Sequence, residues 1–148
     1  MRHALRTEID IPATPEELWR ILTDLAGYAD WNPFITSAAG AVAPGERLSL
    51  RMEPPGGWAM SVRPAVTEAD PMRVLEWLGR LGVPGLFDGR HRFELQPIAG
   101  GTRLVHGETF SGLLVRPMWR WLQGPTRAGF EAMNVSLARR ALADRSAA

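Results

Sequence analysis

The stretch from His91 to Phe110, "HRFELQPIAGGTRLVHGETF", consists of two alternating runs around a glycine pair. A period of two predicts two strands, and the Ala99-Gly100-Gly101 segment predicts the turn between them. Four large apolar side chains lie on the same face of the two predicted strands and should face a core: Phe93, Leu95, Leu104 and Phe110. The alternation places the ionisable residues His91, His106 and Glu108 on this same face. The sequence therefore places three ionisable groups on the side that should be buried.

The register of this hairpin decides how the three groups face one another. If residues 98–101 form the loop, His91 lies opposite Glu108 and Phe93 lies opposite His106. A two-residue loop with a shifted register makes His91 and Glu108 diagonal neighbours. Both registers keep them on one face, whereas a slip by one residue would turn all three groups towards solvent.

The segments before the hairpin predict a strand and two short helices. Residues 2–11 alternate strictly between polar and apolar side chains, which is typical of a half-buried strand. In "ATPEELWRILTDL" (13–25), Thr14 is a good N-cap, Pro15 suits the first helical turn and Glu17 completes a capping box. The segment "YADWNPF" (28–34) predicts a second short helical turn that ends at Pro33.

From Phe34 to Gly112 the pattern is mostly that of β-strands. Apolar residues alternate over 48–52 and 58–62, and the turn signals at 54–57 and 70–71 separate these runs from "RVLEWLG" (73–79). After Gly112, apolar residues recur at helical spacing through "AGFEAMNVSLARRALADR". Because Pro125 cannot donate a backbone hydrogen bond, we expect either a kink or a short helix over 116–123 followed by a long helix from about 126.

This order of elements predicts a single α+β domain over residues 1–148. A curved antiparallel sheet would wrap around the long C-terminal helix, with the two short helices following the first strand. The chain has six Trp, five Phe and six Met, more than a small core needs. We therefore expect the space between sheet and helix to stay open as a ligand cavity.

Composition excludes several classes of function. The chain has no cysteine and no lysine, so thiolate chemistry, disulfides and lysine Schiff bases are excluded. The net charge of +1 gives no sign of a nucleic-acid partner. With no long apolar run, we expect no membrane span and a cytoplasmic location. The glycine-rich "PPGG" and "AGGT" segments are turns without the strand-to-helix context of a phosphate loop, and we expect no cofactor.

Several segments together resemble a known superfamily. They are "IDIPATPEELWRILTDLAGYADWNPF" (9–34), "PGERLSL" (44–50), "VLEWLGRLGVPGLFDG" (74–89), and "HRFEL" (91–95) with "GGTRLVHGETFSG" (100–112). They resemble the SRPBCC (START/Bet v 1-like) superfamily, in its bacterial polyketide cyclase/dehydrase-like branch. The resemblance implies the helix-grip fold and an apolar cavity between the sheet and the C-terminal helix that binds lipids, polyketides or other small hydrophobic molecules. Members range from carriers to cyclases, so the resemblance does not fix the chemistry.

Two interpretations of His91 and Glu108 remain open from the sequence. As catalytic candidates, they form an acid/base pair in which the carboxylate orients the imidazole for proton transfer. As a structural pair, they satisfy each other's hydrogen bonds and fix the register of the sheet. A metal site made of His91, His106 and Glu108 would have a suitable ligand set, but no motif supports ligation, so we expect no metal.

The leading hypothesis is a protein that binds a small hydrophobic ligand in the cavity. The alternatives are a polyketide cyclase/dehydratase-like enzyme and a protein-interaction module of the co-chaperone-activator type, and a homodimer stays open as an assembly state. Trp58 and Trp121 belong with the aromatic side chains that can either line the cavity or fill the core. The candidate ligand-binding residues are Trp31, Phe34, Met52, Met60, Trp77, Phe87, Phe93, His106, Phe110, Trp119, Phe130, Met133 and Asn134. Of these, Asn134 also fits the commoner role of a polar residue on a helix surface.

Overall fold

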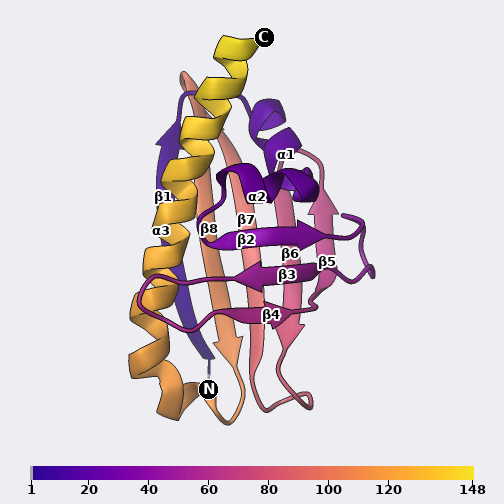
Figure 1. Cartoon of the computed structure of the whole chain (residues 1–148), viewed down its shortest axis with the longest axis vertical. Helices are drawn as coiled ribbons and strands as arrows, with labels where there is room; N and C mark the ends of the chain where they lie inside the picture. Colours follow the sequence, from indigo (N-terminus) through magenta and orange to yellow (C-terminus); the bar gives the residue numbers. More distant parts are fainter. Residues whose placement is uncertain (1) are drawn as a thin grey trace.

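The computed structural model describes residues 2–148, which form eight strands and a few helices (Figure 1). The N-terminal half contains β1 (Arg2–Ile11), α1 (Pro15–Thr23), the 3-10 turn η1 (Leu25–Gly27), α2 (Tyr28–Trp31), β2 (Ile35–Ala39), β3 (Ser49–Met52) and β4 (Met60–Val62). The C-terminal half contains β5 (Ala65–Asp70), β6 (Val74–Arg80), β7 (Asp88–Ile98), β8 (Gly101–Ser111) and α3 (Val115–Ala147).

The strands are antiparallel and divide between two sheets. The five-stranded sheet has the order β1-β8-β7-β6-β5, and the three-stranded sheet has the order β2-β3-β4. An isolated bridge between Arg47 and Ala65 connects the two. In Figure 1 the small sheet lies crosswise over the large one, and α3 runs along the same side. The α+β helix-grip class predicted from the sequence is confirmed, with the β surface divided in two where a single curved sheet was expected.

The β7–β8 hairpin has the register that pairs His91 with Glu108 and Phe93 with His106. Ile98 pairs with Gly101, so Ala99 and Gly100 make the turn, and Gly100 supplies the positive φ of 79° that this turn requires. The predicted inward face is confirmed, because the four apolar residues of this parity and both histidines are buried. On the opposite face, Glu76 of β6 accepts hydrogen bonds from Arg90 and Arg92 of β7.

Local signals set the ends of the first two helices. The Thr14 hydroxyl accepts a hydrogen bond from the Glu17 N–H (3.1 Å), and the Glu17 carboxylate accepts one from the Thr14 N–H (2.9 Å), so the capping box is confirmed. The α2 turn ends at Trp31 with Asn32 as its C-cap, just before Pro33, where the sequence predicted its end. The Asn32 side-chain oxygen accepts hydrogen bonds from the backbone N–H groups of Phe34 and Ile35, which directs the chain into β2.

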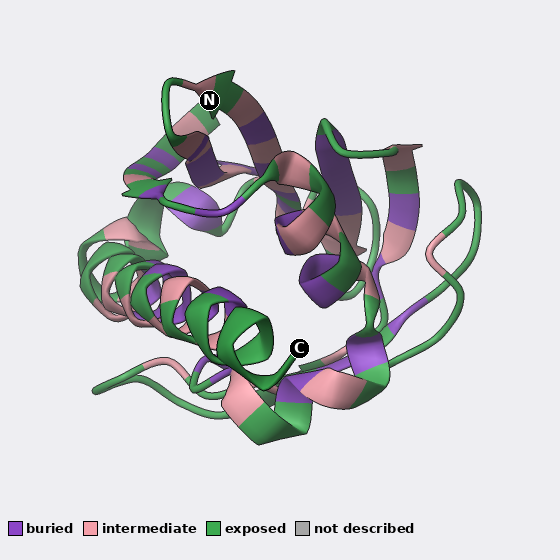
Figure 2. Ribbon diagram, turned by 90° about the horizontal axis from the view of Figure 1, so that it is seen from above, coloured by how far each residue is buried: buried purple, intermediate pink, exposed green. Residues whose placement is uncertain are grey.

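The last helix is continuous through Pro125. Of the two alternatives that the sequence left open, the division into helices over 116–123 and from about 126 is therefore wrong, and a kink within one helix remains compatible with it. Pro125 lies inside α3 and removes one backbone hydrogen bond, at a cost of about 3 kcal/mol for a helix interior. The packing of the following turns against the sheet outweighs this cost, because Phe130, Met133, Leu137 and Ala141 are almost completely buried. Figure 2 shows this buried stripe of α3 facing the inside of the molecule, with the exposed stripe facing out. Within residues 2–148, no helix is both long and apolar enough to cross a membrane.

The contact between α3 and the start of β2 yields a prediction. Gly129 packs against the ring of Phe34 so closely that an added Cβ would collide with it. Alanine favours a helix over glycine by about 1 kcal/mol, but overpacking a core costs about 1–3 kcal/mol. We therefore expect Gly129→Ala to lower the free energy of unfolding in urea titrations. In a Phe34→Leu background, where the ring is absent, the same substitution should be neutral or stabilising. An equal loss in both backgrounds would contradict the proposed collision.

Candidate functional site

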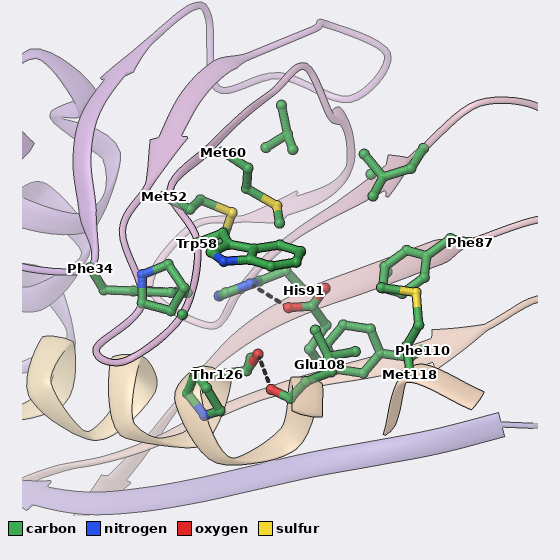
Figure 3. A pocket seen from close by; sticks show the side chains of 18 of the residues that line it. Phe34, Met52, Trp58, Met60, Phe87, His91, Glu108, Phe110, Met118 and Thr126 are labelled. Atoms are coloured by element: carbon green, nitrogen blue, oxygen red, sulfur yellow. Dashed lines mark hydrogen bonds and ion pairs between the residues drawn. The ribbon is translucent and has the colours of Figure 1, made fainter. Parts of the chain in front are cut away.

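A cavity of about 670 Å³ lies between the two sheets and the N-terminal half of α3 (Figure 3). Its lining is mostly apolar, and the predicted residues that line it are Phe34, Met52, Met60, Trp77, Phe87, His91, Glu108 and Phe110. Figure 3 shows Met52, Trp58 and Met60 on one side of the cavity, Phe87 and Phe110 on another, and Thr126 of α3 opposite the small sheet. The imidazole of His91 and the carboxyl group of Glu108 are thus polar groups in a mostly apolar cavity wall.

Seven predicted ligand-binding residues do not line the cavity. Phe93, Phe130 and Met133 are fully buried in the packed core, and His106 lies between the rings of Phe93 and Phe130, at a centroid distance of 4.3 Å from each. The others are Trp31, Trp119 and Asn134. Trp119 packs on His3 and Phe110, and Trp31 packs on Tyr28. Phe93 and His106 have the inward strand parity that the sequence predicted, but parity does not tell how deep a side chain lies.

Several lining residues were outside the predicted set. Trp58 and Trp121, which the sequence left undecided between core and cavity, line the cavity while remaining 88% and 65% exposed. They therefore mark its rim. Met118, Leu122 and Thr126 come from the first turns of α3. Because the sequence left open either a kink or a break at Pro125, it did not predict that these residues share one continuous helix.

A chain of hydrogen bonds leads from the cavity wall into the core. Glu108 Oε1 lies 3.2 Å from His91 Nδ1, and His91 Nε2 lies 2.7 Å from His106 Nε2. His106 Nδ1 lies 2.7 Å from Asn134 Oδ1, and Asn134 Nδ2 donates to the Thr7 hydroxyl at 2.9 Å. The Thr7 hydroxyl donates to the backbone carbonyl of His106 at 2.8 Å. We refer to Thr7, Asn134, His106, His91 and Glu108 as the polar chain.

The contacts of Thr7, at the end of the polar chain that lies farthest from the cavity, fix which atom is the donor in each hydrogen bond of the chain. A carbonyl oxygen only accepts, so the Thr7 hydroxyl donates to it and takes the Asn134 amide N–H on its own oxygen. Asn134 Oδ1 then faces His106, whose Nδ1 must carry the hydrogen. A neutral His106 has a bare Nε2, which accepts from His91 Nε2–H. A neutral His91 in turn has a bare Nδ1, so Glu108 must donate to it as a protonated carboxylic acid.

Burial supports the same protonation states. Desolvation lowers the pKa of His91 to about 3 and raises the pKa of Glu108 to about 8. Desolvation and the neighbouring His91 also lower the pKa of His106 well below its ordinary value. At neutral pH both imidazoles are therefore uncharged and the carboxyl group keeps its proton. The sequence suggested a carboxylate that orients an imidazole, whereas these positions give a carboxylic acid that donates to it.

A glycine makes room for this acid. Gly89 of β7 lines the cavity beside Glu108, and a Cβ at this position would collide with Glu108 Oε2. Among the side-chain hydrogen bonds of residues 2–148, Oε1 faces His91 and none involves Oε2. The carboxyl group therefore uses one oxygen for the polar chain and presents the other at the cavity wall.

The arrangement does not fit a metal ion. The Nε2 atoms of His91 and His106 are 2.7 Å apart, which is a hydrogen-bond distance. Two imidazole nitrogens bound to one zinc ion at about 2.0–2.1 Å each and at a tetrahedral angle would lie more than 3 Å apart. In the part of the chain that the structure describes, no cluster of three or more His, Cys, Asp or Glu side chains has metal-binding geometry.

The opposite pKa shifts predict a stability optimum near pH 6.5. Above the ordinary histidine pKa of 6.5, the folded protein retains until about pH 8 a proton on Glu108 that the unfolded chain has released, so stability falls as pH rises. Below pH 6.5, the unfolded chain binds protons on His91 and His106 that the fold excludes. Stability then falls as pH drops, and Glu108 offsets part of this loss down to its ordinary pKa of 4.5.

Glu108→Gln tests the alkaline side of this profile. Glutamine can donate its amide N–H to His91 but does not titrate, so the loss of stability between pH 6.5 and pH 8, at most about 1.4 kcal/mol per pH unit, should disappear. Urea unfolding at the two pH values measures this effect. Glu16→Gln, at an exposed position on α1, should keep the wild-type profile. A Glu108→Gln variant that loses stability as steeply as the wild type would contradict a protonated Glu108.

Comparison with known proteins identifies the family to which this chain belongs. Residues 2–143 match the family described as "Polyketide cyclase / dehydrase and lipid transport". No curated protein matches the chain in sequence. Among solved structures, protein MLL2253 from Mesorhizobium loti is 25% identical, with a TM-score of 0.74 and coverage of 97% of this chain and 98% of that chain.

Two more distant structures share the fold. Norcoclaurine synthase from Thalictrum flavum is 12% identical, with a TM-score of 0.74 and coverage of 98% of this chain and 97% of that chain. The di-domain ARO/CYC protein StfQ from the steffimycin biosynthetic pathway is 12% identical, with a TM-score of 0.71. All of this chain matches 53% of StfQ. With the family match over nearly the whole length, the chain belongs to the polyketide cyclase/dehydrase and lipid transport family, within the SRPBCC superfamily that its sequence resembles.

Proposed function

We propose that this protein is a single-domain cytoplasmic binder of a small hydrophobic molecule, with Glu108 as the polar contact for the ligand. The observation that carries the proposal is the cavity of about 670 Å³, whose wall is apolar except for a few groups. Ligand pockets typically measure about 300–1,000 Å³ and combine apolar walls with a small number of placed polar groups. The family description, which includes lipid transport, agrees with such a ligand.

The form of the interior supports binding over a protein-interaction module. An interaction module of the co-chaperone-activator type needs an exposed apolar patch and has no use for an enclosed volume. Here the apolar surface lines a hollow, and the exposed Trp58 and Trp121 lie where the hollow opens. These rim side chains can cover the apolar part of a ligand after it enters.

The polar chain also bears on the enzymatic alternative. In an acid/base mechanism His91 needs a free ring nitrogen, but Nδ1 faces Glu108 and Nε2 faces His106, and the residue is only 1% exposed. Proton transfer to or from a ligand would therefore have to pass through the Glu108 carboxyl group. This favours a binding role, in which His91 holds the carboxyl group in place, over a cyclase or dehydratase with His91 as its base.

A cavity-filling variant tests the proposal with N-phenyl-1-naphthylamine, a neutral probe that fluoresces in apolar surroundings. Val62 of β4 lines the cavity, so we expect Val62→Trp to fill part of it and to raise the Kd of the probe by about tenfold or more, equivalent to about 1.4 kcal/mol. The matched control is Val135→Trp at a half-exposed position on α3, which should bind the probe like the wild type. Equal Kd values for the wild type and Val62→Trp would refute binding in this cavity.

Native mass spectrometry of protein purified from its own host provides the second measurement. We expect an additional mass that corresponds to a small organic molecule, and we expect less of it in the Val62→Trp variant. Repeatedly empty spectra for the wild type would favour the interaction-module alternative.

A further inference from the structure

We propose that the cavity selects hydrophobic ligands that carry a hydrogen-bond donor, such as a hydroxyl group, at the end that reaches Glu108, and that it discriminates against ligands with an ether or a carboxylate there. This inference rests on the proposed function and names the chemical class of its ligand. It follows from the direction of the hydrogen bonds in the polar chain.

The first step concerns the Glu108 hydrogen. Thr7 and Asn134 fix the hydrogen position on His106, and His106 in turn fixes the hydrogen position on His91. The bare Nδ1 of His91 therefore accepts a hydrogen bond from the protonated Oε1 of Glu108. The remaining oxygen, Oε2, is then a carbonyl-type acceptor. It lies beside Gly89, and both residues line the cavity.

The second step concerns Thr126 on the helical wall. Its hydroxyl group donates to the backbone carbonyl of Leu122 at 2.7 Å, so its hydrogen is already used and its oxygen can only accept. Glu108 and Thr126 are the lining residues with side-chain oxygen atoms. Both therefore offer lone pairs to a ligand, and a hydroxyl or N–H group can satisfy them.

The third step concerns the competing ligands. An ether oxygen would place its lone pairs against those of Glu108 and leave both acceptors without a hydrogen, which costs about 1–3 kcal/mol for a buried polar group. A carboxylate would also lose its hydration without gaining a buried cation. Arg80 is the single cationic residue of the lining; its side chain is 49% exposed and faces Asp88 at 3.6 Å.

The test uses three probes that share one ring system and differ in one group: 1-hydroxypyrene, 1-methoxypyrene and 1-pyrenecarboxylate. Fluorescence anisotropy in mildly acidic buffer, where Glu108 is protonated, gives the three Kd values. For the wild type, we expect 1-hydroxypyrene to bind about tenfold more tightly than 1-methoxypyrene, the ratio that corresponds to about 1.4 kcal/mol. We expect 1-pyrenecarboxylate to bind most weakly.

Two variants at one position separate the acceptor from the rest of the site. Glu108→Gln can donate its amide N–H to His91 and keep a carbonyl oxygen at the cavity wall, so the preference for 1-hydroxypyrene should remain. Glu108→Leu has no acceptor, so 1-hydroxypyrene and 1-methoxypyrene should bind about equally. Circular dichroism of both variants checks the fold, and the wild-type ratio stands as a test even if Glu108→Leu does not fold.

The outcomes distinguish this inference from the proposed function. If 1-hydroxypyrene and 1-methoxypyrene bind the wild type with equal Kd, the cavity binds hydrophobic ligands but the inferred selection is wrong. If Glu108→Gln loses the preference, Glu108 does not act as a neutral acceptor, and the inference fails in the same way. If neither probe binds and N-phenyl-1-naphthylamine also does not, the proposed function fails and the inference fails with it.

Discussion

The structure depends on the pairing of two strands that alternate strictly between core and solvent. In the β7–β8 hairpin every second side chain faces inward, so a slip by one residue would exchange the whole buried set for the charged set on the other face. The hairpin forms the middle of the five-stranded sheet and pairs with β1 and β6 on its two sides. Its register thus places the apolar core and the ionisable groups at once.

Ionisable groups are tolerated in this interior because their hydrogen bonds are satisfied in one consistent direction. A buried polar group without a partner is costly, but from Thr7 to His91 each member of the polar chain donates to or accepts from its neighbour. Asn134 is the link that comes from the helix, and it connects α3 with β1 and β8 by hydrogen bonds. The polar chain therefore fixes the position of α3 on the sheet as well as the protonation of Glu108.

Much of the fold follows from local sequence signals, whereas the site follows from them only in part. The capping box at Thr14 and the alternation of β7 and β8 each span a few residues and were predicted correctly, and the turn lies within the predicted Ala99-Gly100-Gly101 segment. The role of Asn134 was not, because its partners His106 and Thr7 lie 28 and 127 residues away. Strand parity and helical spacing also could not tell that Phe93 and Phe130 fill the core while Phe87 and Phe110 line the cavity. That outcome depends on where the small sheet crosses the large one.

The interior is thus divided into a filled half and an empty half. Phe93, Phe130, His106 and Asn134 belong to the filled half, while β4, the rim tryptophans and the first turns of α3 bound the empty half. A substitution such as a larger or smaller residue at Met60 or Met118 changes the shape of the hollow without disturbing the packed side. Homologous proteins can therefore evolve to bind different ligands and keep the same fold, because the residues that shape the cavity are not the residues that form the packed core.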